Sequence, residues 1–135
     1  MKDKLEELTE YLDRAYGIDY WSDDAIDYAR ALVNQLGVEQ WDALSAGWNA
    51  KDIEWQVRLA EAVFGCESPR RVDLLLAMLR SEVMDVAVAA AKSLEASDDV
   101  WAPDPSMRSL LQYLHDRAKE EDKYIFEILL AKISD

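Results

Sequence analysis

Apolar residues recur at spacings of three and four along nearly the whole chain, and no segment sustains a strict alternation of apolar and polar residues. This spacing gathers apolar side chains on one face of an α-helix, whereas a half-buried strand requires alternation. The pattern therefore predicts an all-α protein. Eight short helices are expected, at approximately residues 3–16, 23–36, 39–48, 53–64, 70–80, 85–96, 106–118 and 122–133.

Turn-forming residues separate several of these predicted helices. Glycines follow the first, second and fourth helices, where a residue with positive φ commonly closes a helix; they are Gly17, Gly37 and Gly65. Two further helices begin with a proline that follows a capping side chain, Ser68 before Pro69 and Asp104 before Pro105. These signals predict short connections throughout.

The chain is similar to itself at an offset of 31 residues. The segment 41–63 then aligns with 72–94, so that Trp41, Trp48 and Trp55 match Val72, Leu79 and Val86. The segment 28–32 lies one further period before 59–63, and residues 110–133 fit only after an insertion, as a terminal unit often does. A fixed period of this length is typical of stacked helix pairs, each of which buries its apolar stripe against the next pair.

The segment 72–94 resembles a HEAT repeat, with a leucine-rich first helix, an acidic turn, and a second helix rich in valine and alanine. The resemblance extends over about three quarters of the chain. It implies a single domain, residues 1–135, built as a short right-handed α-solenoid (an α-α superhelix) of about four HEAT-like helical hairpins. Small residues are expected to let the second helices approach closely, namely Ala60, Ala62, Ala89, Ala90 and Ala91.

The composition is that of one globular domain, since half of the 135 residues are apolar and 32% are charged. Cys66 is the only cysteine, so no internal disulfide can form, and we expect a buried and inert thiol. The first residues lack the basic flank and apolar run of a signal peptide, and no apolar stretch approaches the ~20 residues that span a bilayer. A cytoplasmic protein without membrane contact is expected.

Acidic residues outnumber basic ones 28 to 15, which gives a formal net charge of −13. The excess is greatest near the N-terminus, with nine acids and four bases in residues 1–36. Such a surface repels phosphate backbones and anionic lipids, which argues against nucleic-acid binding, including that of the HEAT-like DNA glycosylases with their basic grooves. The charge suits a basic protein partner, although an acidic surface also simply keeps proteins soluble.

The residues needed for most enzyme chemistry are scarce. One histidine and one cysteine cannot supply the usual nucleophilic or zinc constellations, and the four glycines do not form a phosphate-binding loop. His115, beside Asp116, is expected to be solvated. The acidic doublets Asp23-Asp24 and Asp98-Asp99 are read as helix caps and surface charge. The sequence therefore predicts no enzyme, no cofactor, no metal and no small-molecule substrate.

Five tryptophans are many for this length, and tryptophan is enriched at binding hot spots. The repeat places Trp41, Trp48 and Trp55 at apolar positions, which favours the core for these three. Trp21 and Trp101 lie near predicted turns and remain open between core and surface. Around the first of them is an aromatic and acidic cluster that could hold a basic partner, comprising Tyr16, Asp19, Tyr20, Trp21, Asp23 and Asp24.

Asp23, Glu54 and Asp85 share one position in three successive units, at the start of each second helix. Acids there interact favourably with the free amides of the helix N-terminus, which is one explanation. Alternatively, stacking gathers them into an acidic ladder that attracts a cationic partner. The candidate partner-binding residues are Asp19, Tyr20, Trp21, Asp23, Asp27, Glu54, Arg58, Glu61, Asp85 and Glu95.

The segment 41–64, with its tryptophan-rich first helix and the sequence WQVRLAE at 55–61, is similar to small α-helical immunity proteins of bacterial polymorphic-toxin and contact-dependent growth inhibition systems. The similarity implies an antitoxin that occludes the active site or substrate-binding surface of a toxin domain, such as a nuclease with a basic cleft. The alternative is a non-catalytic HEAT-like scaffold or adaptor in an endogenous protein complex.

Overall fold

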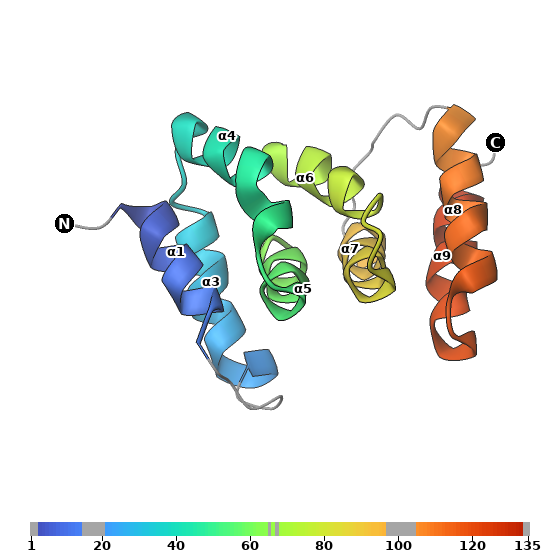
Figure 1. Cartoon of the computed structure of the whole chain (residues 1–135), viewed down its shortest axis with the longest axis horizontal. Helices are drawn as coiled ribbons and strands as arrows, with labels where there is room; N and C mark the ends of the chain where they lie inside the picture. Colours follow the sequence, from blue (N-terminus) through green and yellow to red (C-terminus); the bar gives the residue numbers. More distant parts are fainter. Residues whose placement is uncertain (1–2, 15–20, 65, 67, 97–104, 134–135) are drawn as a thin grey trace.

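The computed structural model describes residues 3–14, 21–64, 66, 68–96 and 105–133, without the side chains of Ser22 and Asp23. In this part of the chain the regular structure is helical throughout and contains no strand, which confirms the predicted all-α class. Figure 1 shows the helices following one another from one end of the molecule to the other in chain order. None of the described helices is both long and apolar enough to cross a bilayer.

Each of the eight predicted helices is present. The α-helices are α1 (Lys4–Leu12), α3 (Ile26–Val33), α4 (Val38–Gly47), α5 (Ile53–Ala62), α6 (Arg70–Met78), α7 (Met84–Ala96), α8 (Pro105–Arg117) and α9 (Lys123–Ile133). Three short helical segments adjoin them, η1 (Trp21–Ala25), η2 (Trp48–Ala50) and η3 (Glu120–Asp122). The segment η1 is π-helical and continues into α3.

Four helices form a continuous row, in which α3 packs against α5, α5 against α7, and α7 against α9. The other helices flank this row, with α1 against α3, α6 against α7, and α8 against α9. In Figure 1, α4 and α6 lie above α5 and α7. The row places α3, α5, α7 and α9 side by side, and so brings residues from distant parts of the sequence onto one surface.

One hydrophobic core runs through all of these helices. Trp41, Trp48 and Trp55 are between 2 and 8% exposed, as their alignment with apolar residues predicts. Trp21, which the sequence leaves open, is also buried, whereas Trp101 lies outside the described residues. The indole N–H of Trp55 donates to the backbone carbonyl of Thr9, 3.1 Å away, so its polar atom is satisfied within the core.

The packed helices α5 and α7 carry several buried small side chains. Ala60, Ala62, Ala90 and Ala91 are fully buried, and Ala89 is nearly so, as expected for small residues that let helices approach closely. Cys66 is buried as predicted, with its thiol 3.9 Å from the carbonyl oxygen of Ser68.

Two predicted helix ends differ from the structure. Gly37 does not close α3 with a positive φ; it has φ −87° and ψ 179°, and its N–H donates to Gln40 Oε1 at 2.8 Å. It therefore begins α4, and Asn34 ends α3 in ordinary right-handed geometry. The first helix ends at Leu12 rather than at residue 16. Gly17 and Gly65 lie outside the described residues.

The proline signals are confirmed in part. The N–H of Arg70 donates to Ser68 Oγ at 3.2 Å, but Pro69 is the N-cap of α6 rather than its first residue, because α6 begins at Arg70. Pro105 is the first residue of α8, where its missing N–H costs nothing. Its predicted capping residue, Asp104, lies outside the described residues.

Candidate binding groove

An open groove of about 750 Å³ runs along α3, α5 and α7 and reaches Asp122 at the start of α9. Its apolar wall includes Trp21, Ile26, Ile53, Val57, Phe64, Val88 and Ala89. Its charged side chains are Arg30, Glu54, Arg58, Glu61, Asp85, Lys92 and Asp122. We call this feature the second-helix groove.

The groove is the repeated face of the second helices. Ile26, Val57 and Val88 lie one 31-residue period apart, and all three line it. The same holds for a second set, Arg30, Glu61 and Lys92, and for the pair Glu54 and Asp85. The 31-residue period that predicts stacked pairs therefore also determines which side chains meet in the groove.

The cation of Arg58 is used within the chain. Its Nη1 donates to the backbone carbonyls of Leu12, at 2.9 Å, and of Arg14, at 2.6 Å. Its guanidinium also lies over the ring of Trp21, 5.6 Å from the centroid, and 4.0 Å from a carboxylate oxygen of Glu54. Arg58 thereby connects the end of α1 to α5 and helps to position Trp21.

The other two cations of the groove are also engaged. Arg30 donates through Nη2 to the carbonyl of Glu61 at 3.3 Å and lies over the ring of Phe64 at 5.0 Å. Lys92 Nζ is 3.7 Å from a carboxylate oxygen of Asp122, a contact that joins α7 to the start of α9. These contacts stabilise the walls of the groove.

Glu61 is a partly buried carboxylate of the groove. It accepts a hydrogen bond from the indole N–H of Trp21 at 3.3 Å, and it forms no ion pair within 4.0 Å among the described residues. Burial raises the pKa of Glu61, against the opposing effects of the Trp21 hydrogen bond and of the charges on Lys92 and Arg30. Its ionised form is therefore incompletely compensated in the free protein.

Two buried polar atoms at the groove lack hydrogen-bond partners in the described part of the chain. Ser93 is only 6% exposed, and its Oγ has no partner. The Nε of Arg30 is likewise buried and unpartnered. Buried polar atoms are nearly always paired in folded proteins, so such exceptions deserve an explanation.

The predicted partner-binding residues divide into three sets. Trp21, Glu54, Arg58, Glu61 and Asp85 come together in the second-helix groove. Asp27 and Glu95 do not line it: the Asp27 side chain is 77% exposed and 4.0 Å from Arg30, while the Glu95 carbonyl accepts from Lys132 Nζ at 3.0 Å. Asp19, Tyr20, Tyr16 and the side chain of Asp23 lie outside the described residues.

Sequence reasoning did not name the apolar wall apart from Trp21, nor Arg30, Lys92, Ser93 and Asp122. The signal for the wall was present, since Ile26, Val57 and Val88 recur at the same period as the acids. Ser93 carried no such signal, because it aligns with Ala62 and reads as one more small residue between helices.

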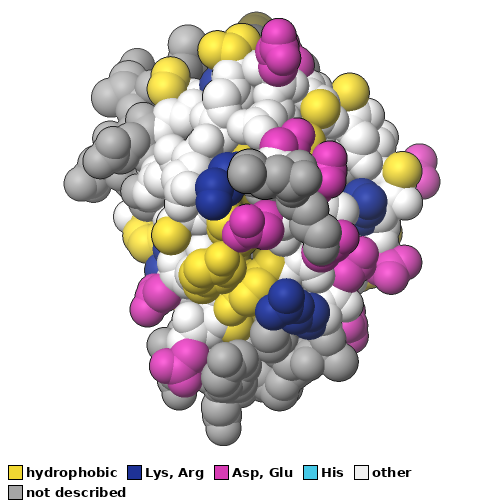
Figure 2. Space-filling model, turned by 90° about the vertical axis from the view of Figure 1, so that its left-hand side faces the viewer, with side chains coloured by type: hydrophobic (Ala, Val, Ile, Leu, Met, Phe, Trp, Pro, Cys, Tyr) yellow, Lys and Arg dark blue, Asp and Glu magenta, His cyan; other side chains and the backbone are white. Residues whose placement is uncertain are grey.

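Figure 2 views the end of the molecule where α1 and α3 lie, and it shows hydrophobic side chains beside acidic and basic ones. The rings of Tyr11 and Tyr28 lie 4.8 Å apart, with the guanidinium of Arg14 over Tyr11. The Tyr28 hydroxyl donates to Glu7 at 2.9 Å, and this hydrogen bond raises the pKa of Tyr28. The polar groups of this surface are thus paired with one another.

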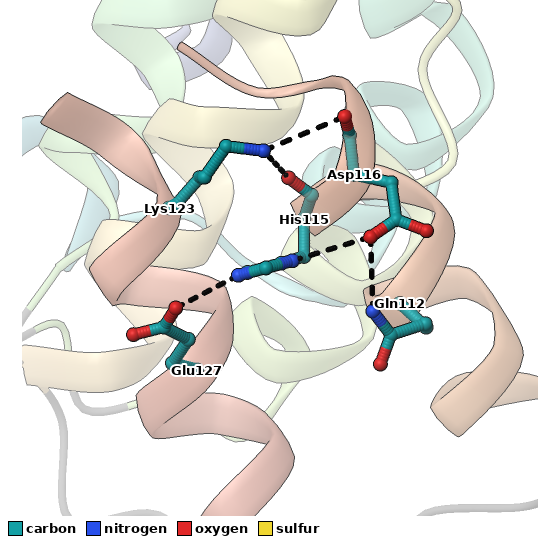
Figure 3. A network of polar contacts seen from close by, with 5 residues as sticks. All are labelled: Gln112, His115, Asp116, Lys123 and Glu127. Atoms are coloured by element: carbon teal, nitrogen blue, oxygen red, sulfur yellow. Dashed lines mark hydrogen bonds and ion pairs between the residues drawn. The ribbon is translucent and has the colours of Figure 1, made fainter. Parts of the chain in front are cut away.

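His115 lies in a polar network between α8 and α9, shown in Figure 3. Its Nε2 is 2.8 Å from Glu127 Oε2, and its Nδ1 is 3.4 Å from Asp116 Oδ1. These two hydrogen bonds, the Glu127 one foremost, raise the pKa of His115. Lys123 Nζ donates to the His115 carbonyl at 2.8 Å. The histidine is therefore held between two helices rather than freely solvated as predicted.

Comparison with known proteins adds no relative: no family model matches the chain, and no curated protein or solved structure matches it significantly. Within the described residues, no group of three or more His, Cys, Asp or Glu side chains could hold a metal ion.

Proposed function

We propose that this chain is a non-catalytic, acidic protein-binding module, a short right-handed HEAT-like α-solenoid whose second-helix groove docks a basic protein partner. The observation that supports this most directly is the groove itself, where an apolar wall and carboxylates from α5 and α7 share one surface of a chain with net charge −13. Central pockets with aromatic and arginine side chains are typical hot spots of protein interfaces.

The groove suits the centre of an interface better than the whole of one. A stable protein interface covers roughly 800 Å² on each partner, so the contact would extend past the groove onto the neighbouring helices. Exposed acidic side chains lie there, among them Asp24 on η1 and Asp27 on α3. Such a rim accelerates the association of a basic partner, while the groove supplies contacts that keep it bound.

The more specific form of the proposal is an immunity protein that neutralises a cognate bacterial toxin, in particular a nuclease, by occluding its active site or substrate-binding surface. Nucleases carry basic clefts for their substrates, and an acidic groove with prearranged side chains complements such a cleft. The same proposal follows from the resemblance to immunity proteins that we expect from residues 41–64, to which the comparisons add nothing.

Co-expression tests this function. The chain is produced together with the C-terminal domain encoded by the adjacent toxin gene, and growth and co-purification are measured. We expect restored growth and a stable complex. Absence of both would reject the immunity function, and recovery of the chain in an endogenous assembly instead would favour the scaffold or adaptor.

Ile53→Arg tests whether the groove is the docking surface. Ile53 is the first residue of α5, half exposed at the groove, and an arginine there adds bulk and a charge of the wrong sign for a basic partner. We expect at least about tenfold weaker binding of the toxin domain by calorimetry. Val38→Arg is the matched control, because Val38 is the exposed first residue of α4 and lies away from the groove. Equal losses in both variants would contradict this location.

A further inference from the structure

The charges of the second-helix groove divide into those already used and those still available. The three cations, Arg30, Arg58 and Lys92, each contact backbone carbonyls, aromatic rings or a carboxylate of the chain itself. In the described residues the side chain of Asp85 has no hydrogen bond or ion pair, and the carboxylate of Glu61 accepts only from the indole of Trp21. The groove therefore offers uncompensated negative charge, although its residue count of acids and bases is nearly balanced.

The enclosure of Glu61 gives this charge a preferred ligand. Burial disfavours its ionised form in the free protein, so a cation beside it would recover interaction energy that the free protein forgoes. A cation held next to an exposed carboxylate in water would recover much less.

The surroundings of the two carboxylates fit a long basic side chain. Val57 and Val88 supply apolar surface for the methylene groups, as lysine and arginine side chains commonly use. Ser93 also contributes to the groove wall, but its Oγ is closed off from the groove and is not counted among the groups that contact the partner.

We propose that the second-helix groove is a binding site for an arginine or lysine side chain of the partner, whose cationic group pairs with Glu61 while Asp85 adds negative charge to the same groove. This inference rests on the proposed function, and it names the partner chemistry that the groove recognises. An anionic ligand is disfavoured, because each cation that it would need is already engaged with the chain.

The direct experiment uses the full chain and two probes, a hexa-arginine and a hexa-lysine peptide, at about 0.15 M salt, where long-range attraction is screened. Binding is measured by calorimetry and by the indole N–H resonances of the tryptophans in a ¹⁵N spectrum. We expect the Trp21 resonance to shift, because its N–H donates to Glu61, while those of Trp41 and Trp48 stay in place. A Trp21→Phe variant assigns the resonance.

The deciding comparison is between two variants with the same change of charge. Glu61→Gln with Asp85→Asn is expected to weaken peptide binding by about tenfold or more. Glu39→Gln with Asp73→Asn is the control, because both residues are exposed acids in the first turn of α4 and α6, away from the groove. Should the first variant fail to fold by circular dichroism, Asp85→Asn alone, at an exposed position, replaces it and is expected to weaken binding severalfold.

Several outcomes would overturn the inference: no peptide binding, equal losses in both variants, or binding of inorganic phosphate with the same Trp21 shift. The co-expression experiment distinguishes a failure of the cationic site from a failure of the proposed function. Capture of the toxin domain without peptide binding leaves the function intact and removes the cationic site. Peptide binding without capture of any toxin domain would support the cationic site and reject the immunity function.

Discussion

Glu61 illustrates how a single residue can be unfavourable for the fold and useful for binding. Its carboxylate is partly withdrawn from water, and a hydrogen bond from Trp21 compensates only in part. Because the folded pKa is raised, the stability contributed by protonated Glu61 is present at low pH and lost as the pH rises through the folded pKa. At neutral pH the free protein therefore bears the cost of an ionised and partly buried carboxylate.

Glu61→Gln is expected to stabilise the free protein at pH 7, because the amide is neutral and its oxygen can still accept from the Trp21 indole. The denaturant midpoints of the variant and of the original chain should converge below the ordinary glutamate pKa of 4.5. A variant that is less stable at pH 7 would show that ionised Glu61 stabilises the fold after all.

His115 provides a second pH-dependent element, at the hairpin of α8 and α9. Its pKa is expected above the ordinary 6.5 in an NMR titration, and Glu127→Gln should lower it because Glu127 provides the strongest hydrogen bond to the ring. Because the pKa of His115 is raised in the folded protein, the His115–Glu127 pair stabilises the fold fully below pH 6.5. This stabilisation is lost as the pH rises through the folded pKa of His115. An unchanged titration in Glu127→Gln would remove the pair as its cause.

At the scale of elements, the helices were predictable because their signal is local. Apolar residues at three- and four-residue spacings set each helix and its buried face, and the 31-residue offset set the correspondence between pairs. The prediction for Gly37 was wrong because a glycine between two helices can end one or begin the next, and the side chain of Gln40 decided for the second.

The groove was predictable only in part. Trp21, Glu54, Arg58, Glu61 and Asp85 were named because repeat position and residue type point to them. The sequence does not show which charges of the groove remain available to a partner. Their availability depends on contacts between individual side chains and residues far away along the sequence. The bonds from Arg58 to carbonyls at the end of α1 cross 44 to 46 residues and leave no trace in the repeat.

Leu75→Ala and Leu94→Ala test the packing of α6 and α7. Both leucines are about 1% exposed, so each truncation should lower the free energy of unfolding by about 2–5 kcal/mol. Val38→Ala, at a residue that is 72% exposed, should change it by less than about 0.5 kcal/mol. Denaturant titration measures all three, and similar small changes would refute the assigned register.

At the scale of the whole molecule, the net charge of −13 acts together with the shape of the helix row. Carboxylates near the starts of α5 and α7 repeat along one surface, where their potentials add. The favourable interaction of Glu54 and Asp85 with their own helix N-termini is compatible with this, since both side chains remain exposed to an approaching partner.

Reversing Glu54 and Asp85 to lysine should slow association with a basic toxin domain by about tenfold at low salt, without loss of helical content by circular dichroism. The difference should shrink as salt is raised, because the Debye length falls to about 3 Å at 1 M. Stopped-flow fluorescence of the tryptophans measures the rates. Rates that match those of the original chain at every salt concentration would leave these two acids with a helix-stabilising role alone.

The bonds from α5 to the backbone of α1 have a consequence for any shortened form of the protein. The last carbonyls of a helix usually face water, but those of Thr9 and Leu12 receive the indole of Trp55 and the guanidinium of Arg58. A chain that started at Trp21 would lack these two carbonyls, so the Trp55 indole and Arg58 Nη1 would each lose an acceptor. The N-terminal helix α1 therefore supports the α5 side of the groove. Affinity tags or fluorophores are better attached after α9 than in place of α1.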